Sequence, residues 1–481
     1  MGHNVLSGYR FTRSTILLGM LWLFIVYGFA DLPDAAAQAH SAKHAAYPLR
    51  VSANGRYLVD QKGAPFLITG DSPQSIMTLL TLKQAAHYFS VREKQGFNTA
   101  GWIDAICAGP DCALSKDAST VNGMRPFTGY VAGGRDYEHY DMSKPNEDYF
   151  KQLDAVVALA AKHGFLVFLN PCAANGWLPT LRNNGIAAAY DYGKYLGQRY
   201  RKYPNVAWLS GVDFSTWKDL RDDALVRAVV RGIKAEAPHQ LQTLELWATA
   251  SSLDNRPWAR VLSLNGTYTY SSAYMQIEHS YNQNPVMPTF LMETHYEDEC
   301  VGEPRDCGTA PVLRRQEYWS MLSGGKGVWY GNFYFWTFNP AWESHFNTIG
   351  VAQIGIWKSF FTSLPWQELV PDGAHKVVVS GLGAYGTFQT PVSKSEFSTA
   401  AVTPDGKVVV VYMPTARSIT VNMAEIKAPA SAKWFDPTDG SYSEAAAGRV
   451  VNKGEHTFTP PAHNHSGDGD WVLLLDASSA R

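Results

Sequence analysis

Val206-Ala-Trp-Leu-Ser-Gly-Val-Asp213 is an apolar segment that ends in one carboxylate, and Thr289-Phe-Leu-Met-Glu293-Thr-His295 repeats this pattern. A short apolar run bounded by turn signals predicts a buried strand. A carboxylate at the end of such a strand is costly to keep dry when it has no partner. In a barrel of alternating strands and helices, that end carries the chemistry. The two acids therefore predict the carboxylate pair that glycosidic-bond hydrolysis needs, as proton donor and as nucleophile or base.

Six further apolar runs continue the strand pattern around these two segments. The eight candidate strands are residues 65–70, 97–103, 165–170, 206–209, 242–247, 261–264, 289–292 and 327–330. Helical periodicity separates them over residues 82–94, 147–163, 187–203, 220–237 and 311–323, with a last helix over 349–364. Eight strands that alternate with helices predict an α/β fold of the (β/α)8 TIM barrel type rather than an open sheet.

The character of the chain changes after Pro365. Seven short, β-branched segments follow, and turn sequences such as Pro404-Asp-Gly-Lys407 separate them. This spacing is typical of an all-β sandwich. With 481 residues the chain has room for a barrel of about 250 residues and a second domain. We therefore predict a barrel domain over residues 48–368 and a C-terminal all-β sandwich over residues 370–478.

The N-terminus has the order of a secretory signal peptide. Arg10 and Arg13 precede an apolar run over residues 16–30, and Ala37-Gln38-Ala39 offers a small-residue cleavage site. The run is shorter than the roughly 20 residues that a membrane span requires. We expect residues 1–39 to be a signal peptide and the protein to be secreted or periplasmic. The alternative is an uncleaved membrane anchor formed by residues 16–30.

Cysteine spacing suits an oxidising compartment. Cys107 and Cys112 enclose one short turn-rich loop, and Cys300 and Cys307 enclose another, so each pair predicts a local disulfide. Cys172 is left over and follows an apolar strand, which favours a buried free thiol over a nucleophile. The cysteines and histidines lack zinc spacing, so we expect no metal.

Composition excludes several classes of partner. Basic and acidic side chains number 41 and 43, and this balance argues against a nucleic-acid binder. The chain shows neither a phosphate-cradling glycine loop nor a Gly-x-Ser-x-Gly elbow, which disfavours a nucleotide enzyme, a cofactor and a serine esterase. Aromatic residues make up 13% and suit sugar-stacking platforms, although several can also belong to the core. We expect a carbohydrate as the partner.

Polar and aromatic residues at the other strand ends are candidates for substrate binding. They are Asp71, Trp102, Asp104, Asn170, Trp177, Glu245, Trp247, Tyr268, His295, Tyr330 and Trp336. Asp71 could hold two sugar hydroxyls, or it could cap the turn that follows. His295 could contact substrate, or it could orient Glu293 through a hydrogen bond. The disulfide loop after Glu293 would form a rim, because loops at this face vary with specificity.

A family resemblance accompanies these residues. Four segments match in order: Phe66-Leu-Ile-Thr-Gly-Asp71, Arg92-Glu-Lys-Gln-Gly-Phe-Asn98, Trp208-Leu-Ser-Gly-Val-Asp213 and Met292-Glu293. Over residues 48–365 the chain resembles the apiosidase-like catalytic domains of glycoside hydrolase family 140, and its tail resembles the domain described as collagen-binding that often follows them. The resemblance implies that Asp213 is the acid/base and Glu293 the nucleophile. Gln74 departs from the pattern, since an aromatic residue is expected there.

The acid pair and the N-terminal segment together predict an exported glycoside hydrolase that cleaves a plant or microbial polysaccharide or oligosaccharide. The roles that the resemblance implies for Asp213 and Glu293 favour retention of anomeric configuration by double displacement, and the separation of the two carboxyls decides between retention and inversion. Retaining enzymes hold their carboxyls about 5–5.5 Å apart, whereas inverting enzymes hold them about 6.5–9.5 Å apart. The alternative is an inactive carbohydrate-binding or surface-adhesion protein built on a barrel. An inactive barrel has no reason to keep both Asp213 and Glu293.

Overall fold

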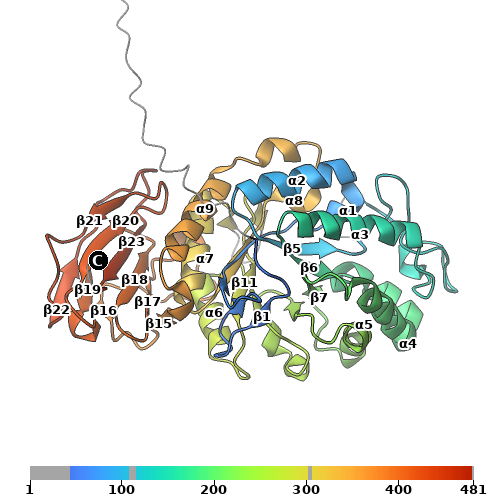
Figure 1. The fold of residues 1–481 in the computed structure, drawn as a ribbon, viewed down its shortest axis with the longest axis horizontal. Coiled ribbons are helices and arrows are strands. Elements are labelled where there is room, and N and C mark those ends of the chain that lie inside the picture. The colour runs from blue at the N-terminus through green and yellow to red at the C-terminus, as the bar shows by residue number, and fades with distance from the viewer. Residues whose placement is uncertain (1–43, 108–114, 302–305, 479–481) are drawn as a thin grey trace, which may run out of the picture. The chain divides into compact units, whose positions relative to one another are not determined.

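Eight parallel strands form a barrel in the computed structural model, which describes residues 44–107, 115–301 and 306–478 (Figure 1). They are β4 (Ile68–Asp71), β5 (Thr99–Asp104), β6 (Leu166–Asn170), β7 (Val206–Phe214), β8 (Gln242–Leu246), β10 (Asn265–Tyr268), β11 (Thr289–Glu293) and β14 (Gly327–Tyr330). Along the sheet they pair in the order β8-β7-β6-β5-β4-β14-β11-β10, and β9 (Ala250–Ser251) adds an antiparallel strand beside β10. The predicted barrel is confirmed. The predicted signal peptide, residues 1–39, lies outside the described residues.

A serine side chain bridges the junction between β8 and β10. The Ser252 hydroxyl donates to the carbonyl of Leu244 on β8 and accepts from the amide of Gly266 on β10, at 2.5 and 3.0 Å. These two bonds replace the direct backbone hydrogen bonds that would otherwise pair β8 with β10. They satisfy the backbone groups that an open barrel would leave unpaired, and the ring of strands is nearly closed.

The sixth barrel strand differs from the prediction. It is β10 at Asn265–Tyr268, whereas the prediction placed it at residues 261–264. Buried Leu262 and Leu264 gave the apolar signal, but Asn265-Gly266 resembles a turn in sequence. The Asn265 side chain is satisfied inside the barrel, because its Oδ1 accepts from the Leu253 amide at 3.0 Å. Buried hydrogen bonds therefore stabilise a strand that lacks the usual apolar pattern.

The helices alternate with the strands along the barrel. They are α1 (Ile76–Leu79), α2 (Leu82–Lys94), α3 (Glu147–Lys162), α4 (Ala174–Tyr200), α5 (Leu220–Glu236), α6 (Ala273–Tyr281), α7 (Ala310–Leu322), α8 (Phe333–Thr337) and α9 (Ile349–Thr362). Thr81 caps α2 in a capping box with Gln84. The predicted helix at 187–203 is the second half of α4, which breaks at Gly185. Among the described residues, no helix combines the length and apolar character of a membrane span.

One tryptophan fills the barrel interior. The Trp329 indole from β14 lies against Gly70 on β4 and Gly101 on β5, where an added Cβ would approach its ring to 2.3 and 2.4 Å. The rings of Phe168 and Phe290 contact it at centroid distances of 4.9 and 5.0 Å. Two glycines thus make room for a large side chain, and the barrel is packed rather than hollow.

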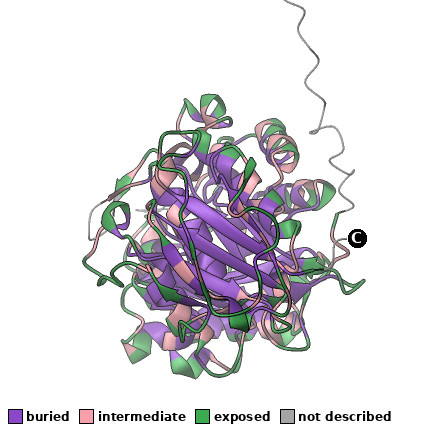
Figure 2. Ribbon diagram, turned by 90° about the vertical axis from the view of Figure 1, so that its left-hand side faces the viewer, coloured by how far each residue is buried: buried purple, intermediate pink, exposed green. Residues whose placement is uncertain are grey.

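The C-terminal domain is a sandwich of two antiparallel sheets, as predicted. The larger sheet has the order β15 (Val370–Pro371), β17 (Thr399–Val402), β18 (Val408–Met413), β23 (Trp471–Asp476), β20 (Ser431–Phe435), β21 (Tyr442–Glu444), and the smaller has the order β16 (Val378–Ser380), β19 (Ile419–Asn422), β22 (Glu455–Phe458). Figure 2 looks onto this side of the molecule and shows buried strands surrounded by exposed turns. A third small sheet, β1 (Arg50–Val51), β2 (Leu58–Val59) and β3 (Pro65–Phe66), precedes the barrel.

Strand β18 is buried on both faces. Val409, Val411 and Met413 pack inside the sandwich, whereas Val408, Val410 and Tyr412 belong to the core that the barrel shares. The Tyr412 ring stacks on Tyr318 of α7 with centroids 4.9 Å apart. Because side chains alternate along a strand, burial on both faces requires the unbroken apolar run seen here.

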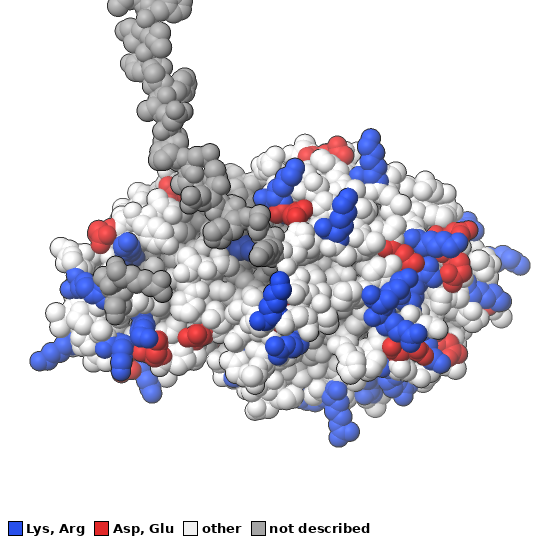
Figure 3. Space-filling model, in the orientation of Figure 1, with Lys and Arg blue, Asp and Glu red and all other residues white. Residues whose placement is uncertain are grey.

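Charged side chains are intermixed on the surface. On the face drawn in Figure 3, Lys and Arg lie among Asp and Glu. Helix α3 supplies an example, because the exposed side chains of Lys151 and Asp148 pair at 2.9 Å. Such intermixing differs from the basic stripe typical of nucleic-acid binders.

Candidate active site

Both predicted acids line one cavity at the mouth of the barrel. Its volume is about 210 Å³, and its walls are Gln74, Trp102, Asn175, Asp213, Tyr270, Glu293, Tyr296, Glu299 and Trp336. Asp213 comes from β7 and Glu293 from β11, the fourth and seventh barrel strands. The cavity therefore joins two carboxyls from separate strands with two indole rings.

A bulge turns Asp213 toward the cavity. Gly211, Val212 and Asp213 have φ values of 83°, 64° and 46°, and the register between β7 and β8 shifts there. A Cβ at Gly211 would lie 2.2 Å from the Glu245 carbonyl oxygen, so this close approach requires glycine. Burial raises the pKa of Asp213 to about 6, and the nearby Tyr268 hydroxyl opposes that rise. This acid holds its proton in mildly acidic solution.

Glu293 sits at the end of β11 within a group of acids. Its side chain is buried, and its Oε1 accepts a hydrogen bond from the Tyr270 hydroxyl at 3.4 Å. Burial raises the pKa of Glu293 well above its usual range, and the Glu245 carboxyl raises it further through its charge and a hydrogen bond. The charge of Asp213 acts in the same direction. The three carboxyls therefore cannot all be ionised together.

A chain of tyrosines links the two sides of the cavity. Tyr268 on β10 donates to the Tyr270 hydroxyl at 3.2 Å, and Tyr270 in turn donates to Glu293. Tyr268 was predicted as a substrate contact, but it is buried and does not line the cavity. Tyr270, which does line it, was missed. Its spacing of two residues from Tyr268 was the available signal.

Gln74 and Tyr296 form the opposite wall. The Gln74 amide donates to the Tyr296 hydroxyl at 3.1 Å. A Cβ at Gly331 would lie 2.3 Å from the Tyr296 ring, so the end of β14 approaches this ring closely. Gln74 therefore places a polar amide in the cavity where the resemblance led us to expect an aromatic side chain. Tyr296 lies in a loop and had no strand-end signal.

Trp102 lines the cavity, whereas Asp104 and Asn170 lie behind its ring and support it. The Trp102 indole donates to Asp104 Oδ1 at 2.7 Å, and the Asn170 amide donates to the same oxygen at 2.6 Å. Burial raises the pKa of Asp104 to about 7, and these two donors oppose the rise. Asp104 and Asn170 were predicted to bind substrate. Their contacts assign them instead to the support of the Trp102 ring.

Asp71 lies away from the cavity in a buried ion pair. Its Oδ2 accepts from the Arg92 guanidinium at 2.6 Å and from the Tyr88 hydroxyl at 2.7 Å, while its Oδ1 accepts from the Ser72 amide at 2.9 Å. Arg92 is fully buried, and the Phe335 ring lies 4.1 Å from its guanidinium carbon. These contacts favour the structural alternative over a sugar contact, because both carboxylate oxygens already accept from protein donors.

Trp177 and Tyr330 also lie outside the cavity wall. Trp177 is fully buried against the rings of Tyr137 and Tyr140. Tyr330 donates to Glu297, whose Oε1 accepts from the Gly350 amide at the start of α9. A strand-end position placed both residues near the mouth, but it did not show which way their side chains point.

His295, Trp247 and Trp336 take three different positions. His295 is buried beside the Tyr270 ring, with centroids 5.5 Å apart, and burial lowers its pKa to about 4, so the ring is neutral at pH 7. Trp247 follows β8, and 49% of its side chain is exposed. Trp336 lines the cavity near Glu299. Of these three predicted contacts, only Trp336 belongs to the cavity wall.

A disulfide hairpin adjoins the cavity. Cys300 and Cys307 are bonded across β12 (Cys300–Val301) and β13 (Asp306–Cys307), which confirms that predicted pair. Glu299, just before the hairpin, lines the cavity, and burial raises its pKa. Cys112 of the other predicted pair lies outside the described residues. Cys172 is free and buried, as expected.

Metal ligands do not gather in this part of the fold. Within residues 44–107, 115–301 and 306–478, no group of three or more Cys, His, Asp or Glu side chains could hold a metal ion.

Two family models match the chain. The model for "Apiosidase-like, catalytic domain" matches residues 52–368, and the model for "Putative collagen-binding domain of a collagenase" matches residues 390–476. No curated protein matches the chain.

Solved structures share the fold at low sequence identity. One is titled "Glycoside hydrolase"; it is 22% identical, with coverage of 91% of this chain and 98% of its own and a TM-score of 0.73. A glycoside hydrolase of family 5 from Bacteroides vulgatus is 20% identical, with coverage of 90% and 94% and a TM-score of 0.74. These likenesses extend over both domains. Because the first family model spans the whole barrel that carries the cavity, the chain belongs to the apiosidase-like catalytic domain family and is a glycoside hydrolase.

Proposed function

We propose that this glycoside hydrolase acts by retaining double displacement, with Asp213 as the acid/base and Glu293 as the nucleophile. The observation that carries the proposal is the convergence of both carboxyls on one small cavity that two indole rings also line. The two acids stand on the fourth and seventh strands, where the family resemblance puts these roles. Their surroundings also differ, since Tyr270 donates to Glu293 and Tyr268 lies beside Asp213.

The first step transfers the glycosyl group to the enzyme. A Glu293 oxygen attacks the anomeric carbon, the bond from that carbon to the leaving oxygen breaks, and Asp213 gives its proton to the leaving oxygen. In the second step the Asp213 carboxylate takes a proton from water as the water attacks the anomeric carbon. The ester to Glu293 then breaks, and both acids return to their starting states.

Glu245 is the neighbouring carboxyl that must carry the shared proton when Glu293 attacks. It is fully buried on β8, and its carboxyl faces Glu293. When two carboxyls share a site, one retains its proton at neutral pH. Because the Glu245 carboxyl raises the pKa of Glu293, the mechanism requires the shared proton to lie on Glu245 during the attack, where Glu245 donates to Glu293 and stabilises its negative charge. This gives Glu245 a positioning role instead of the substrate contact expected from its place on the strand.

The cavity suits one sugar ring. Drug-sized ligands occupy roughly 300–1,000 Å³, so a cavity of about 210 Å³ fits a smaller unit. Trp102 and Trp336 offer apolar faces to the ring, and Gln74 offers a hydrogen-bonding amide. Trp247 follows β8, which pairs with the strand that carries Asp213. Its half-exposed indole is suited to the leaving group, because Asp213 protonates the oxygen on that side.

Export is the proposed route to the site of action. The Cys300–Cys307 disulfide supports it, because disulfides persist in oxidising compartments. Residues 1–39 would direct the chain there and be removed. N-terminal sequencing of the protein from its own host tests this: a mature chain that begins close to residue 40 is expected, and retention of residues 1–39 would favour the membrane-anchored alternative.

A glycoside panel with three matched amide variants tests the mechanism. Glu293→Gln is expected to lose several orders of magnitude in kcat on every substrate. Asp213→Asn should lose as much on sugar leaving groups but keep most of its glycosylation rate on activated aryl leaving groups, which need no proton. Glu317→Gln is the control, because Glu317 is a buried acid on α7 that does not line the cavity. NMR of the first-formed anomer should show retention.

Two results would contradict the proposal. Normal hydrolysis by Glu293→Gln excludes that residue as the nucleophile. Inversion at the anomeric carbon excludes the double displacement, even if both acids prove essential.

A further inference from the structure

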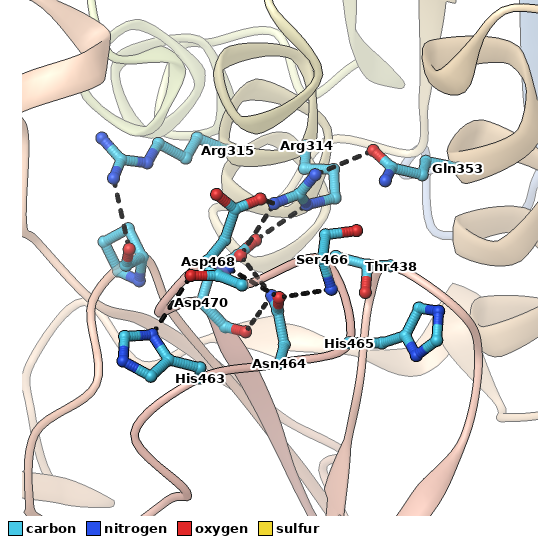
Figure 4. Close-up of polar contacts among 12 residues, drawn as sticks. Arg314, Arg315, Gln353, Thr438, His463, Asn464, His465, Ser466, Asp468 and Asp470 are labelled. Atoms are coloured by element: carbon cyan, nitrogen blue, oxygen red, sulfur yellow. Dashed lines mark hydrogen bonds and ion pairs between the residues drawn. The ribbon is translucent and has the colours of Figure 1, made fainter.

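The C-terminal domain contacts the barrel through a buried ion pair. Arg314 on α7 is 1% exposed, and its guanidinium donates to both Asp470 oxygens at 2.9 and 2.8 Å and to Asp468 at 2.7 Å (Figure 4). Asn464 donates to the same Asp470 carboxylate at 2.8 Å. Helix α9 joins through Gln353, which accepts from Arg314 at 2.8 Å. A guanidinium and a carboxylate buried together with these partners fix the two domains at one angle.

A segment of the C-terminal domain, residues 388–397, extends this interface toward the cavity. Arg315, next to Arg314, donates to the Val392 carbonyl at 2.7 Å. The Trp319 indole on the same helix donates to the Phe397 carbonyl at 2.9 Å. Both contacts use backbone acceptors, so the path of this segment is held independently of its own side chains.

One contact of this segment lies beside a cavity residue. The Ser271 hydroxyl donates to the Phe388 carbonyl at 2.8 Å, and Ser271 is 1% exposed. Ser271 directly follows Tyr270, whose hydroxyl donates to Glu293. The Gln316 amide on α7 completes the group, because it donates to the Ser271 carbonyl at 2.9 Å and to the Thr294 hydroxyl at 2.7 Å.

A second contact lies at the disulfide hairpin. The Ser393 amide donates to Asp306 Oδ2 at 2.7 Å. Asp306 opens strand β13, which pairs with β12 through Cys300 and Cys307. Glu299, one residue before the hairpin, lines the cavity. The 388–397 segment thus contacts both loops that supply this side of the wall.

We propose that the C-terminal domain contributes to the catalytic site: its 388–397 segment positions Tyr270 through Ser271 and Glu299 through Asp306. Ser271 and Asp306 are positioning residues, since neither lines the cavity. This inference rests on the proposed nucleophilic role of Glu293. A hydrogen bond to a carboxylate lowers its pKa, so a displaced Tyr270 would leave the Glu293 pKa higher. A site loosened by a fraction of an ångström also loses rate.

Two variants that each remove one hydroxyl between the C-terminal domain and the barrel distinguish a positioning role of this domain from simple attachment. Ser271→Ala removes the bond to Phe388. Tyr385→Phe is the matched control, because it removes the bond of 3.0 Å from the Tyr385 hydroxyl to Glu278 near the end of α6. Each deletion removes one hydrogen bond between the domains, so similar small losses of melting temperature are expected. Only Ser271→Ala should lower kcat/KM, by about 10-fold, since misplaced groups cost rate steeply.

The pH profile of kcat/KM and amide hydrogen exchange would not change if the C-terminal domain were only attached to the barrel. In Ser271→Ala the acidic limb of kcat/KM should shift to higher pH, and hydrogen exchange over residues 265–274 should rise. Tyr385→Phe should match the wild type in both. Ser393→Pro, which removes the amide that Asp306 accepts from, should raise KM with a smaller effect on kcat.

The exchange measurement needs no catalysis, so it separates this inference from the proposed mechanism. If Glu293 proves not to be the nucleophile, faster exchange in Ser271→Ala still supports the positioning contact. If Ser271→Ala matches Tyr385→Phe in exchange, pH profile and kcat/KM, the C-terminal domain is only attached and the inference is wrong.

Discussion

The Trp102 indole donates a hydrogen bond of 2.7 Å to Asp104, two residues further along β5. Side chains two apart on a strand share a face, so the acid lies directly behind the ring that lines the cavity. Asp104 is fully buried, and burial raises its pKa to about 7. One wall of the cavity therefore rests on an acid that titrates near neutral pH.

Asp104→Asn should flatten the dependence of stability on pH. Unfolded Asp104 releases its proton near pH 4, whereas the folded protein holds the proton until about pH 7. The stability linked to this proton is thus complete below pH 4 and is lost as the pH rises through about 7. The shift from 3.8 to about 7 corresponds to at most about 4 kcal/mol. Urea unfolding at pH 5 and pH 8 measures the difference, which should be smaller in the variant than in the wild type.

Arg314→Met should destabilise the whole protein. The substitution leaves Asp470, 3% exposed, without its charged partner. Removing one member of a buried ion pair costs about 3–5 kcal/mol. Lys407→Met is the control, because Lys407 and Asp405 form an exposed pair in the domain that carries Asp470, and it should leave the melting temperature unchanged. Equal effects of the two variants would mean that Arg314 contributes no more than a surface charge.

Gly101→Ala should strain the floor of the barrel. The added methyl would lie 2.4 Å from the Trp329 indole, which Phe168 and Phe290 hold in place. Overpacking of this kind costs about 1–3 kcal/mol. Gly373→Ala is the matched control, because nothing lies within 4 Å of the added atom. Denaturant midpoints check the prediction, and an unchanged midpoint for Gly101→Ala would show that Trp329 can move aside.

Trp247→Ala should weaken the binding of sugar leaving groups. Its indole is 49% exposed and offers a free face near the strand that carries Asp213. Loss of an aromatic contact worth about 0.5–1.5 kcal/mol corresponds to a fall in kcat/KM of about two- to tenfold. Activity on a glycoside with a small methanol leaving group should be unchanged. A similar loss on both substrates would place Trp247 elsewhere in the mechanism.

The fold could be predicted because its strands follow simple patterns. Seven of the eight barrel strands coincide with apolar runs, and the unbroken run in β18 reflects its burial on two faces. The sixth strand was misplaced, because Asn265 is a polar residue in a buried strand. Its side chain is satisfied by hydrogen bonds that the local sequence pattern does not reveal. The hydrogen-bond partners of the Asn265 side chain, Leu253 and Gln283, are distant in sequence. They can be identified only in the three-dimensional structure.

The site was predicted in part for a related reason. Asp213 and Glu293 stood out as acids at the ends of apolar segments, and the structure places both on the cavity. The alternating spacing of Trp102 and Asp104 could not show that one faces the cavity while the other supports it. Tyr296 and Glu299 lie in loops, where no periodicity indicates direction. The strand ends therefore located the mouth of the barrel, but they did not identify which side chains line the cavity.

The double burial of β18 bears on where this protein can be divided. A chain that stopped after α9 would leave the Tyr318 and Phe360 rings facing water, since Tyr412 and Phe435 cover them in the whole molecule. Exposed apolar patches of this kind favour aggregation. The barrel is continuous in sequence, yet residues of the C-terminal domain complete the hydrophobic core around its helices α7 and α9. The catalytic unit of this hydrolase, in terms of solubility, is the pair of domains.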